Sequence, residues 1–256
     1  MLHLLKRHPW RVQAHFDWSL ALVFALPVEK LRPLLPPGLE PDTYGEWGFV
    51  AAAFVQTRRL RPSWAPSWMA QDFFLAGYRI FVRSTLPDGR RRRGLYILGS
   101  DTDSRRMVRL GTVLTHYGYR LRIVNMVKTD EQLSLEVRQP AGQVEVSLQA
   151  SLTPATSPPP DSPFPDLVTA RRFAGPMPFT FSHEPETNSL VVVEGARQHW
   201  IPRPVSVQVQ HLAFFQREPF ASQGLPLLAN AFYVEDVDYQ WARGVVTPIT
   251  PSNANA

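Results

Sequence analysis

The sequence predicts a mainly β protein (α+β), folded as a closed or nearly closed, mostly antiparallel barrel with a few short helices on its outside. Runs of alternating apolar and polar residues recur along the chain, as expected of strands with one buried face. Turn residues such as Pro140-Ala141-Gly142 separate these runs. The 25 prolines among 256 residues argue against long helices. So many strands would leave open edges, and closing the sheet into a barrel removes those edges.

Composition fits a soluble protein with a full core, since 44% of the residues are hydrophobic. The absence of cysteine excludes disulfides, thiolate metal sites and a cysteine nucleophile. The apolar run at residues 20–26 is far shorter than the roughly 20 residues of a membrane span. We therefore expect a cytoplasmic protein with no membrane partner. Its net charge of +5 comes mostly from arginine, because the only lysines are Lys6, Lys30 and Lys128.

The expected strands are short apolar or alternating runs bounded by turn residues. In chain order they cover residues 16–26, 46–57, 73–84, 94–99, 119–123, 133–137, 144–148, 178–183, 189–194, 205–209 and 230–237. Short helices are expected at residues 28–35, after residues 101–104, and at residues 166–173. The remaining segments are an N-terminal arm at 1–11, an aromatic loop at 60–69, a proline-rich loop at 153–165 and a disordered tail at 247–256. We assign residues 1–256 to one domain.

The strand at residues 73–84 presents two different faces. Phe74, Ala76 and Tyr78 share one face with the apolar residues that follow, whereas Arg79 and Arg83 lie on the other. In a small barrel, alternate strand residues face either the lumen or the outside. Both arginines are therefore candidates to reach an internal pocket. The turn at residues 87–89 joins this strand to the next one as a hairpin.

Polar and charged residues are concentrated between residues 95 and 122. Asp101, Asp103 and Ser104 follow a strand and open an arginine-rich helix. One interpretation is helix capping, in which Asp103 or Ser104 bonds free N–H groups at the positive helix end. The other makes Asp101 a pocket acid or base, held against Arg105 or Arg79. The sequence leaves both interpretations open.

Helical spacing divides the residues of this helix between two faces. Arg105 and Arg109 share one face, and Met107, Leu110 and Leu114 share another. The arginines therefore cannot all point toward a pocket. His116 and Tyr117 follow at the end of the helix, and we keep them as candidate pocket residues because they close the same wall.

Several other kinds of site lack their sequence signatures. The seven histidines have no zinc spacing, so no metal is predicted. There is no Gly-x-Ser-x-Gly motif and no glycine-rich phosphate loop, so no cofactor is predicted. The arginines at residues 90–93 lie at a hairpin tip without interleaved aromatic residues, so no nucleic-acid partner is expected.

The order of these features resembles the acetoacetate decarboxylase-like superfamily, and within it the uncharacterised YqjF-like branch. The resemblance is carried by ALPVEKLRPLLPPGLEPDTYGEWGFVAAAF at residues 25–54, FFLAGYRIFVR at 73–83 and GLYILGSDTDSRRMVRLG at 94–111. It covers residues 16–138 well and the remainder loosely. It implies a cone-shaped β-barrel with a pocket inside, often in an oligomer.

The characterised decarboxylases of this superfamily form an imine between the substrate and a lysine whose pKa is lowered by a neighbouring lysine. The resemblance places that pair near residues 105–108, which are Arg105, Arg106, Met107 and Val108 here. It places the family's pocket glutamate near Leu75, which is apolar. Because arginine cannot form the imine, we expect no acetoacetate decarboxylase activity.

Two hypotheses for function follow. The first is a small-molecule-binding barrel for a small carboxylate or keto acid, in which the Arg79 guanidinium pairs with the ligand. The alternative is a lysine-independent enzyme of the lyase or hydrolase type, which acts on a small organic acid and uses Asp101 for proton transfer. Both place the ligand against Tyr78, Arg79, Tyr96, Asp101, Asp103, Arg105 and His116. Whether the protein is an enzyme, and whether it forms a homo-oligomer, stays open.

Overall fold

The protein was analysed as a computed structural model, which describes residues 2–85, 89–173, 177–221 and 226–249. Its strands are β1 (Val12–Pro27), β2 (Glu40–Pro41), β3 (Trp47–Pro62), β4 (Gln71–Thr85), β5 (Arg91–Thr102), β6 (Tyr119–Leu121), β7 (Ile123–Lys128), β8 (Gln132–Arg138), β9 (Val144–Pro154), β10 (Phe179–Glu184), β11 (Ser189–Arg197), β12 (Arg203–Leu212), β13 (Leu227–Trp241) and β14 (Val245–Pro248). The α-helices are α1 (Val28–Leu31), α2 (Arg105–Leu114) and α3 (Leu167–Phe173). Short 3-10 helices are η1 (Leu2–Arg7), η2 (Arg32–Leu34), η3 (Ser67–Met69), η4 (Pro185–Thr187) and η5 (Ala213–Gln216).

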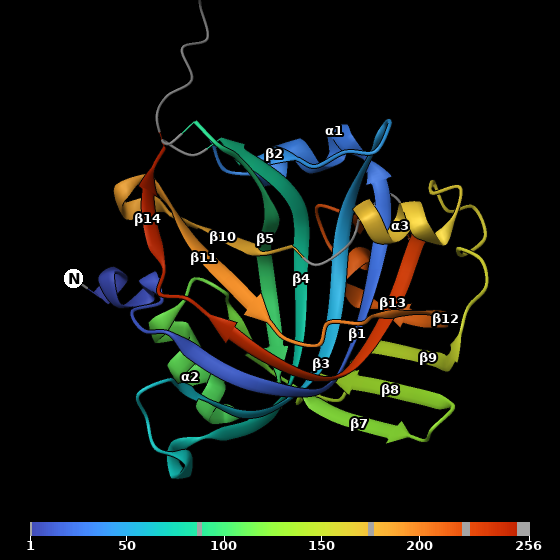
Figure 1. Cartoon of the computed structure of the whole chain (residues 1–256), viewed down its shortest axis with the longest axis horizontal. Coiled ribbons are helices and arrows are strands. Elements are labelled where there is room, and N and C mark those ends of the chain that lie inside the picture. The colour runs from blue at the N-terminus through green and yellow to red at the C-terminus, as the bar shows by residue number, and fades with distance from the viewer. Residues whose placement is uncertain (1, 86–88, 174–176, 222–225, 250–256) are drawn as a thin grey trace, which may run out of the picture.

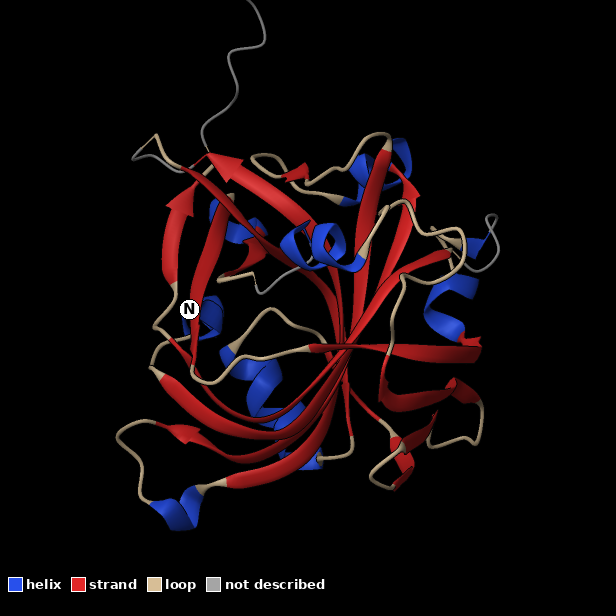
Figure 2. Ribbon diagram, turned by 45° about the vertical axis from the view of Figure 1, so that its right-hand side comes forward, coloured by secondary structure: helices blue, strands red, loops and turns tan. Residues whose placement is uncertain are grey.

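The strands form a sheet that closes on itself, which confirms the predicted barrel (Figures 1 and 2). β1 pairs with β3 on one side and β13 on the other, and the pairing continues through β4, β5, β10 and β11. Residues 195–197 of β11 pair with residues 239–241 of β13 and so close the ring. The pairs are antiparallel except β5 with β10, which meet at residues 94–96 and 179–181. These strands (β1, β3, β4, β5, β10, β11 and β13) are called the barrel.

A second antiparallel layer, made of β7, β8, β9 and β12, covers part of the outside of the barrel (Figure 1). We call it the meander sheet. The alternation expected at residues 133–137 is confirmed, since Leu133, Leu135 and Val137 are buried. They belong to the main hydrophobic core together with outward-facing barrel residues such as Leu20 and Leu22 of β1. The main core therefore lies between the barrel and the meander sheet, and leaves the barrel interior available for other uses.

Three segments differ from the prediction. Residues 119–123 split into β6 and β7, because residues 119–121 pair with β5 whereas the strand from Ile123 pairs with β8. β3 continues to Pro62, into the segment expected to be a loop. The predicted disordered tail began at residue 247, but β14 includes residues 247 and 248 and pairs with β11, and Ile249 packs in the main core. Residues 250–256, like Pro87 and Asp88 of the predicted turn, lie outside the described residues.

The N-terminal arm is anchored by an ion pair between the partly exposed Arg7 and the buried Glu184. Arg7 donates to Glu184 at the end of β10 from Nε at 2.9 Å and from Nη2 at 2.6 Å. The Thr187 hydroxyl donates to the same carboxylate at 2.6 Å. The hydrogen bonds from Arg7 and Thr187 hold the pKa of Glu184 at about 2, although burial alone would raise it. As a result η1 is held beside α2 (Figure 1).

Within the described ranges, no helix is long and apolar enough to cross a membrane. α2 is the longest α-helix, with 10 residues. The helices instead cover the ends and outside of the barrel, as the sequence predicts.

Replacing Glu184 with Gln should lower the free energy of unfolding at neutral pH. The difference from the wild type should become smaller as the pH falls. A carboxyl whose pKa falls from 4.5 to about 2 on folding stabilises the folded state fully above the unfolded value. That contribution, at most roughly 3 to 4 kcal/mol, is lost as the pH falls from about 4.5 to about 2. Urea denaturation of both proteins across this range measures the difference in free energy of unfolding. The exposed neighbour Glu186, changed to Gln, serves as the control. A difference that does not depend on pH would contradict the prediction.

Candidate ligand-binding site

The interior of the barrel contains a cavity of about 140 Å³, lined by residues from β1, β3, β4, β5, β10, β11 and β13. We call it the inner chamber. Small side chains make room for it, among them Ser19, Ala21, Ala51 and Ala53. From the sequence, the small side chains of residues 51–53 suggest tight packing against another element. In the structure, Ala51 and Ala53 instead face this chamber. Phe49, Phe81 and residues of α3 form a separate apolar cluster inside the barrel.

A second cavity, of about 300 Å³, lies toward the end of the barrel that α2 and the N-terminal arm cover. We call it the outer chamber. α2 contributes Met107, Leu110, Gly111 and Leu114, which recur at the spacing of one helix face. At Gly111 a Cβ atom would overlap the ring of Tyr119, so only glycine lets the helix approach β6 this closely. α2 thus forms one wall of the outer chamber.

Arg79 lies where the two chambers meet and lines both. Its guanidinium rests across Gly77, because a Cβ on that glycine would be 2.8 Å from Nη2. In the described part of the chain, no hydrogen bond or ion pair reaches the guanidinium. No aspartate or glutamate is among the described residues that line either chamber. The barrel therefore encloses a cation with no anion beside it.

Tyr117, Tyr119 and Tyr239 lie close enough to Arg79 to interact with its charge. Burial lowers the pKa of Arg79, and burial raises the pKa of Tyr117 and Tyr119. At neutral pH Tyr117 and Tyr119 are accordingly uncharged hydroxyl donors, while an arginine remains charged even when its pKa falls. An enclosed charge without a partner is costly, and a bound anion would relieve that cost.

A second arginine of the inner chamber, Arg197, already has contacts with other residues of the protein. Arg197 donates to the Met177 carbonyl at 2.8 Å. Its guanidinium also lies 4.9 Å from the centroid of the Trp200 ring and 5.4 Å from that of Tyr239. These cation–π contacts hold Arg197 against the wall. Arg171 of α3 also lines the inner chamber and is exposed to solvent, so Arg79 is the arginine of this chamber that lies on a barrel strand without such contacts to described residues.

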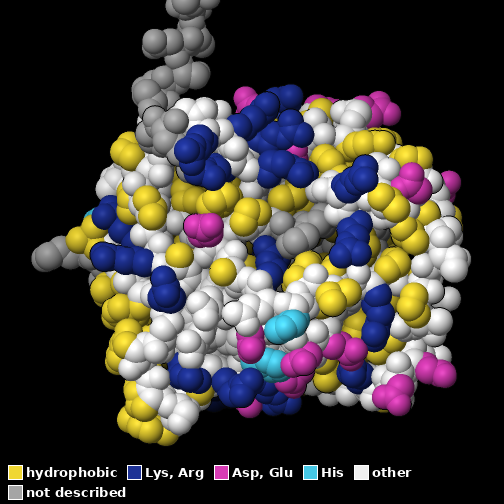
Figure 3. Space-filling view, viewed as in Figure 1, with side chains coloured by type: hydrophobic (Ala, Val, Ile, Leu, Met, Phe, Trp, Pro, Cys, Tyr) yellow, Lys and Arg dark blue, Asp and Glu magenta, His cyan; other side chains and the backbone are white. Residues whose placement is uncertain are grey.

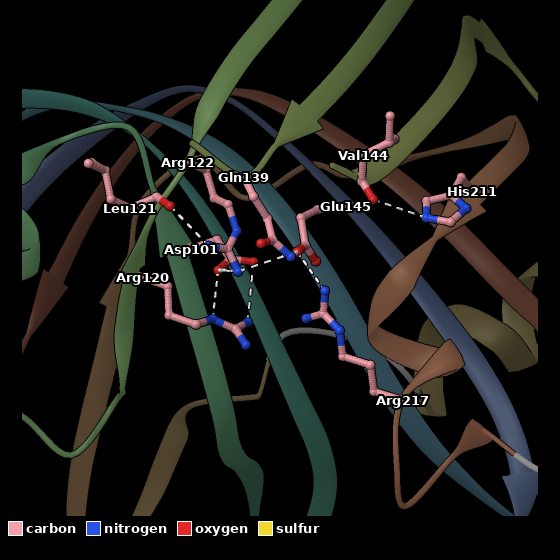
Figure 4. Close-up of polar contacts among 9 residues, drawn as sticks. All are labelled: Asp101, Arg120, Leu121, Arg122, Gln139, Val144, Glu145, His211 and Arg217. Carbon is pink, nitrogen blue, oxygen red and sulfur yellow. Dashed lines mark hydrogen bonds and ion pairs between the residues drawn. The ribbon is translucent and has the colours of Figure 1, made fainter. Parts of the chain in front are cut away.

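Asp101 belongs to a buried ion-pair network on the outer face of the barrel wall (Figure 4). Arg120 reaches its carboxylate from Nε at 2.8 Å, and Arg122 from Nη2 at 3.1 Å. Arg122 also lies 3.7 Å from Glu145, which accepts from Arg217 at 2.6 Å. Burial raises the pKa of Asp101 more than the two arginines lower it. The network ties β5 and β6 to β9 of the meander sheet.

Of the predicted site residues, Arg79 and Tyr117 are among those that line the two chambers. Tyr78 faces away from them, stacked on Phe214 with 4.2 Å between ring centroids. Tyr96 packs against the same outer core, and Asp101 is in the network described above. The structure therefore separates Tyr78 and Asp101 from Arg79, whereas the sequence analysis placed them on one wall.

The other predicted residues lie near the start and the end of α2. Ser104 caps the helix by accepting from the Met107 N–H at 3.1 Å, as the capping interpretation predicts. Asp103 accepts from the Phe74 N–H at 2.8 Å, and Arg105 is exposed. His116 lies 3.8 Å from Glu184 rather than in a chamber. Asp103, Arg105 and His116 do not line either chamber, so a ligand role for them remains a prediction that their positions do not support.

Sequence reasoning missed Gly77, Tyr119 and Tyr239. Gly77 had a local signal, because it lies two residues before Arg79 on the same strand and leaves space beside it. Tyr239 comes from β13, at the opposite end of the chain, and no local pattern relates it to Arg79.

The model of the DUF2071 family, described as an uncharacterized conserved protein, matches residues 15–246. The chain belongs to the DUF2071 family. No curated protein matches its sequence. Among solved structures, this DUF2071 protein is similar to the acetoacetate decarboxylase of Legionella pneumophila subsp. pneumophila str. Philadelphia 1, with 12% identity, a TM-score of 0.64, and coverage of 93% of this chain and 87% of that one.

Two further solved structures share the fold. The enduracididine biosynthesis enzyme MppR has 13% identity and a TM-score of 0.64, over 93% of this chain and 89% of that one. An acetoacetate decarboxylase-like enzyme from Sphingomonas wittichii RW1 has 12% identity and a TM-score of 0.58, over 94% of each chain. At these identities the likeness shows the fold, and it confirms the resemblance predicted from the sequence.

The substitution Gly77→Ala should displace the Arg79 guanidinium with little change in stability. The added Cβ would meet Nη2 at 2.8 Å and Cζ at 3.1 Å, and the end of an arginine side chain can move away. The arginine Nε–H signal of Arg79 in a proton–nitrogen NMR spectrum, assigned by its loss in Arg79→Gln, should shift. In the control Gly99→Ala, the Cβ meets Arg120 at an ordinary 3.7 Å, and the Arg79 signal should stay in place. Equal shifts in both variants would contradict this placement of the guanidinium.

Proposed function

We propose that this DUF2071 protein binds a small carboxylate or keto acid inside its barrel, and that Arg79 holds the carboxylate. The observation that carries the proposal is the enclosed guanidinium without a carboxylate beside it in the described lining. A guanidinium offers paired N–H donors that match the two oxygens of a carboxylate. The hydroxyls of Tyr117, Tyr119 and Tyr239 can donate to further oxygens, such as that of a keto group.

The comparisons support this class of ligand. A structure of MppR, which has 12% identity and a TM-score of 0.59 with this chain, is described as a complex with pyruvate. A keto acid is thus bound by a protein of the same fold. Because the identity is low, the comparison supports the chemical class rather than the particular compound.

We further propose that the chain is not an acetoacetate decarboxylase. The imine route needs a lysine in the cavity, and no lysine is among the described residues of either chamber. Lys6 is on η1 and Lys30 is exposed on α1. Lys128 lies at the end of β7, 3.0 Å from Glu235.

Incubation with acetoacetate followed by borohydride should leave the mass of the protein unchanged, because no amine faces the bound keto group. Mass spectrometry of the intact chain measures the result. An acetoacetate decarboxylase treated in parallel provides the positive control, since its imine is reduced to a stable adduct. An adduct on Lys6, Lys30 or Lys128 would contradict the proposal.

The alternative is a lysine-independent lyase or hydrolase that uses Asp101 for proton transfer. Burial raises the pKa of Asp101, as suits a group that exchanges protons. However, Arg120 bonds both of its oxygens, at 2.8 and 3.3 Å, and the residue is not part of the described lining of either chamber. Binding by Arg79 is therefore the better supported function.

Arg79→Gln should weaken the binding of acetate, pyruvate and acetoacetate by roughly 10- to 100-fold, since a hydrogen bond to a charged group contributes about 1.5 to 3 kcal/mol. The ligand-free variant should be more stable than the wild type, because a half-buried charge with no anion beside it has been removed. Isothermal titration and thermal unfolding measure the two effects. Arg105→Gln, at an exposed position of α2, should bind as the wild type does. Binding that survives Arg79→Gln, or that is lost in Arg105→Gln, would contradict the proposal.

A further inference from the structure

The outer chamber is lined mainly by apolar side chains between Arg79 and the surface. Leu75 and Phe73 follow Arg79 along β4 toward the mouth, and Ile97 adds to this wall from β5. Met107 and Leu114 of α2 are on the other side. A cavity of about 300 Å³ is at the lower end of the range of ligand sites. An acid as small as acetate or pyruvate would occupy the neighbourhood of Arg79 and leave this apolar space empty.

A ring of unpartnered polar atoms marks the outer end of the apolar stretch. Thr57 Oγ1, Arg61 Nε and Gln71 Oε1 are buried and have no hydrogen-bond partner within the described residues. All three residues line the outer chamber, and we call them the polar collar. Thr57 pairs with Phe73 across β3 and β4, and Gln71 lies two residues further toward the surface. The collar is therefore level with Phe73 or beyond it.

The strand gives the length of the apolar stretch. The guanidinium lies over Gly77, and Phe73 is four positions away from Gly77 along β4. At about 3.3 Å per strand residue, roughly 13 Å separates the cation from the collar. Between these two polar levels a ligand would meet mostly hydrocarbon.

The mouth of the outer chamber is also apolar. Trp10 and Trp64 line it with ring centroids 6.0 Å apart, and Trp64 remains 64% exposed. Leu110 of α2 lines the chamber as well and is 40% exposed. Figure 3 shows apolar side chains gathered along the left and lower left of the molecule, where Figure 1 shows η1 and the connection between β3 and β4. A ligand that enters here passes apolar groups before it reaches Arg79.

We propose that the ligand is a monocarboxylate with an extended apolar body, such as a medium-chain fatty acid. Its carboxylate pairs with Arg79, and its hydrocarbon fills the outer chamber as far as the polar collar. The inference rests on the proposed function, since it uses the same arginine, and it names the class of acid that the site selects. Selectivity arises because each methylene removed from water contributes to binding, whereas a short acid leaves the chamber unfilled.

A series of straight-chain acids from acetate through butanoate, hexanoate and octanoate to decanoate tests the inference by isothermal titration, below the concentrations at which they aggregate. The affinity should rise roughly three- to fourfold per methylene and level off when the chain reaches the collar. Octylamine should bind poorly, because its ammonium group would face Arg79. An affinity that does not change with chain length would overturn the inference.

Substitutions on α2 test the location of the tail. Leu114→Trp fills the outer chamber and should abolish the gain of octanoate over acetate while acetate still binds. Leu110→Trp, at a half-exposed position of the same wall, should shorten the optimal chain and keeps the test available if Leu114→Trp does not fold. Val113→Trp is the matched control, since Val113 is 44% exposed and is not among the residues of the chamber. A chain-length dependence that is the same in all three variants would overturn the inference.

The Arg79→Gln variant separates a failure of the inference from a failure of the proposed function. If every acid binds in a way that depends on Arg79 but without regard to length, only the inference fails. If octanoate binds equally well to Arg79→Gln while acetate does not, the hydrocarbon binds without the proposed anchor and only the inference fails. If neither acid depends on Arg79, both fail. Weak binding of acetate and strong binding of octanoate, both reduced in Arg79→Gln, supports both.

Discussion

The enclosed positive charge of Arg79 is the constraint around which the interior of this barrel is arranged. A half-buried guanidinium with no carboxylate beside it raises the free energy of the folded state unless something compensates for it. Among the described residues, the polar groups near Arg79 are the neutral hydroxyls of tyrosines. Carboxylates such as Asp101 and Glu145 lie outside the lining of both chambers. Stability and anion binding are therefore linked, because an anion that binds the folded state alone also stabilises it.

The two faces of the barrel wall have different roles: the outer face packs in the hydrophobic core, and the inner face lines the cavity. The outer face supplies most of the hydrophobic burial, where Leu20, Leu22 and Tyr78 pack in the main core that the meander sheet shares. The inner face has small residues such as Ala51 and Ala53 and leaves space. Because the period-two alternation assigns adjacent residues to opposite faces, one strand can serve both purposes without compromise. β4 illustrates this directly, with Tyr78 in the core and Arg79 in the cavity.

The same alternation of strand residues determines which parts of the site could be predicted from the sequence. It identified the barrel, the buried face of the meander sheet and Arg79 as a residue of the lumen. Applied strictly, it also excludes Tyr78 from the wall that Arg79 occupies. The ion pairs of Asp101 depend on how β6 lies beside β5, and no local pattern reports that pairing. The lack of carboxylates around Arg79 is likewise a property of many distant residues together, so it becomes visible only in three dimensions.

The ring of strands is not equally strong around its circumference. β10 and β11 form a hairpin that joins β5 over residues 94–96 and β13 over residues 195–197, whereas β1 pairs with β3 and β13 over most of its length. The hairpin is thus held to the barrel on either side by three residue pairs, and it carries Thr180 and Arg197 of the inner chamber. Local opening follows the segments with the fewest contacts. By residue pairs, this hairpin is the part of the described barrel wall with the fewest contacts to its neighbouring barrel strands, and it borders the inner chamber directly.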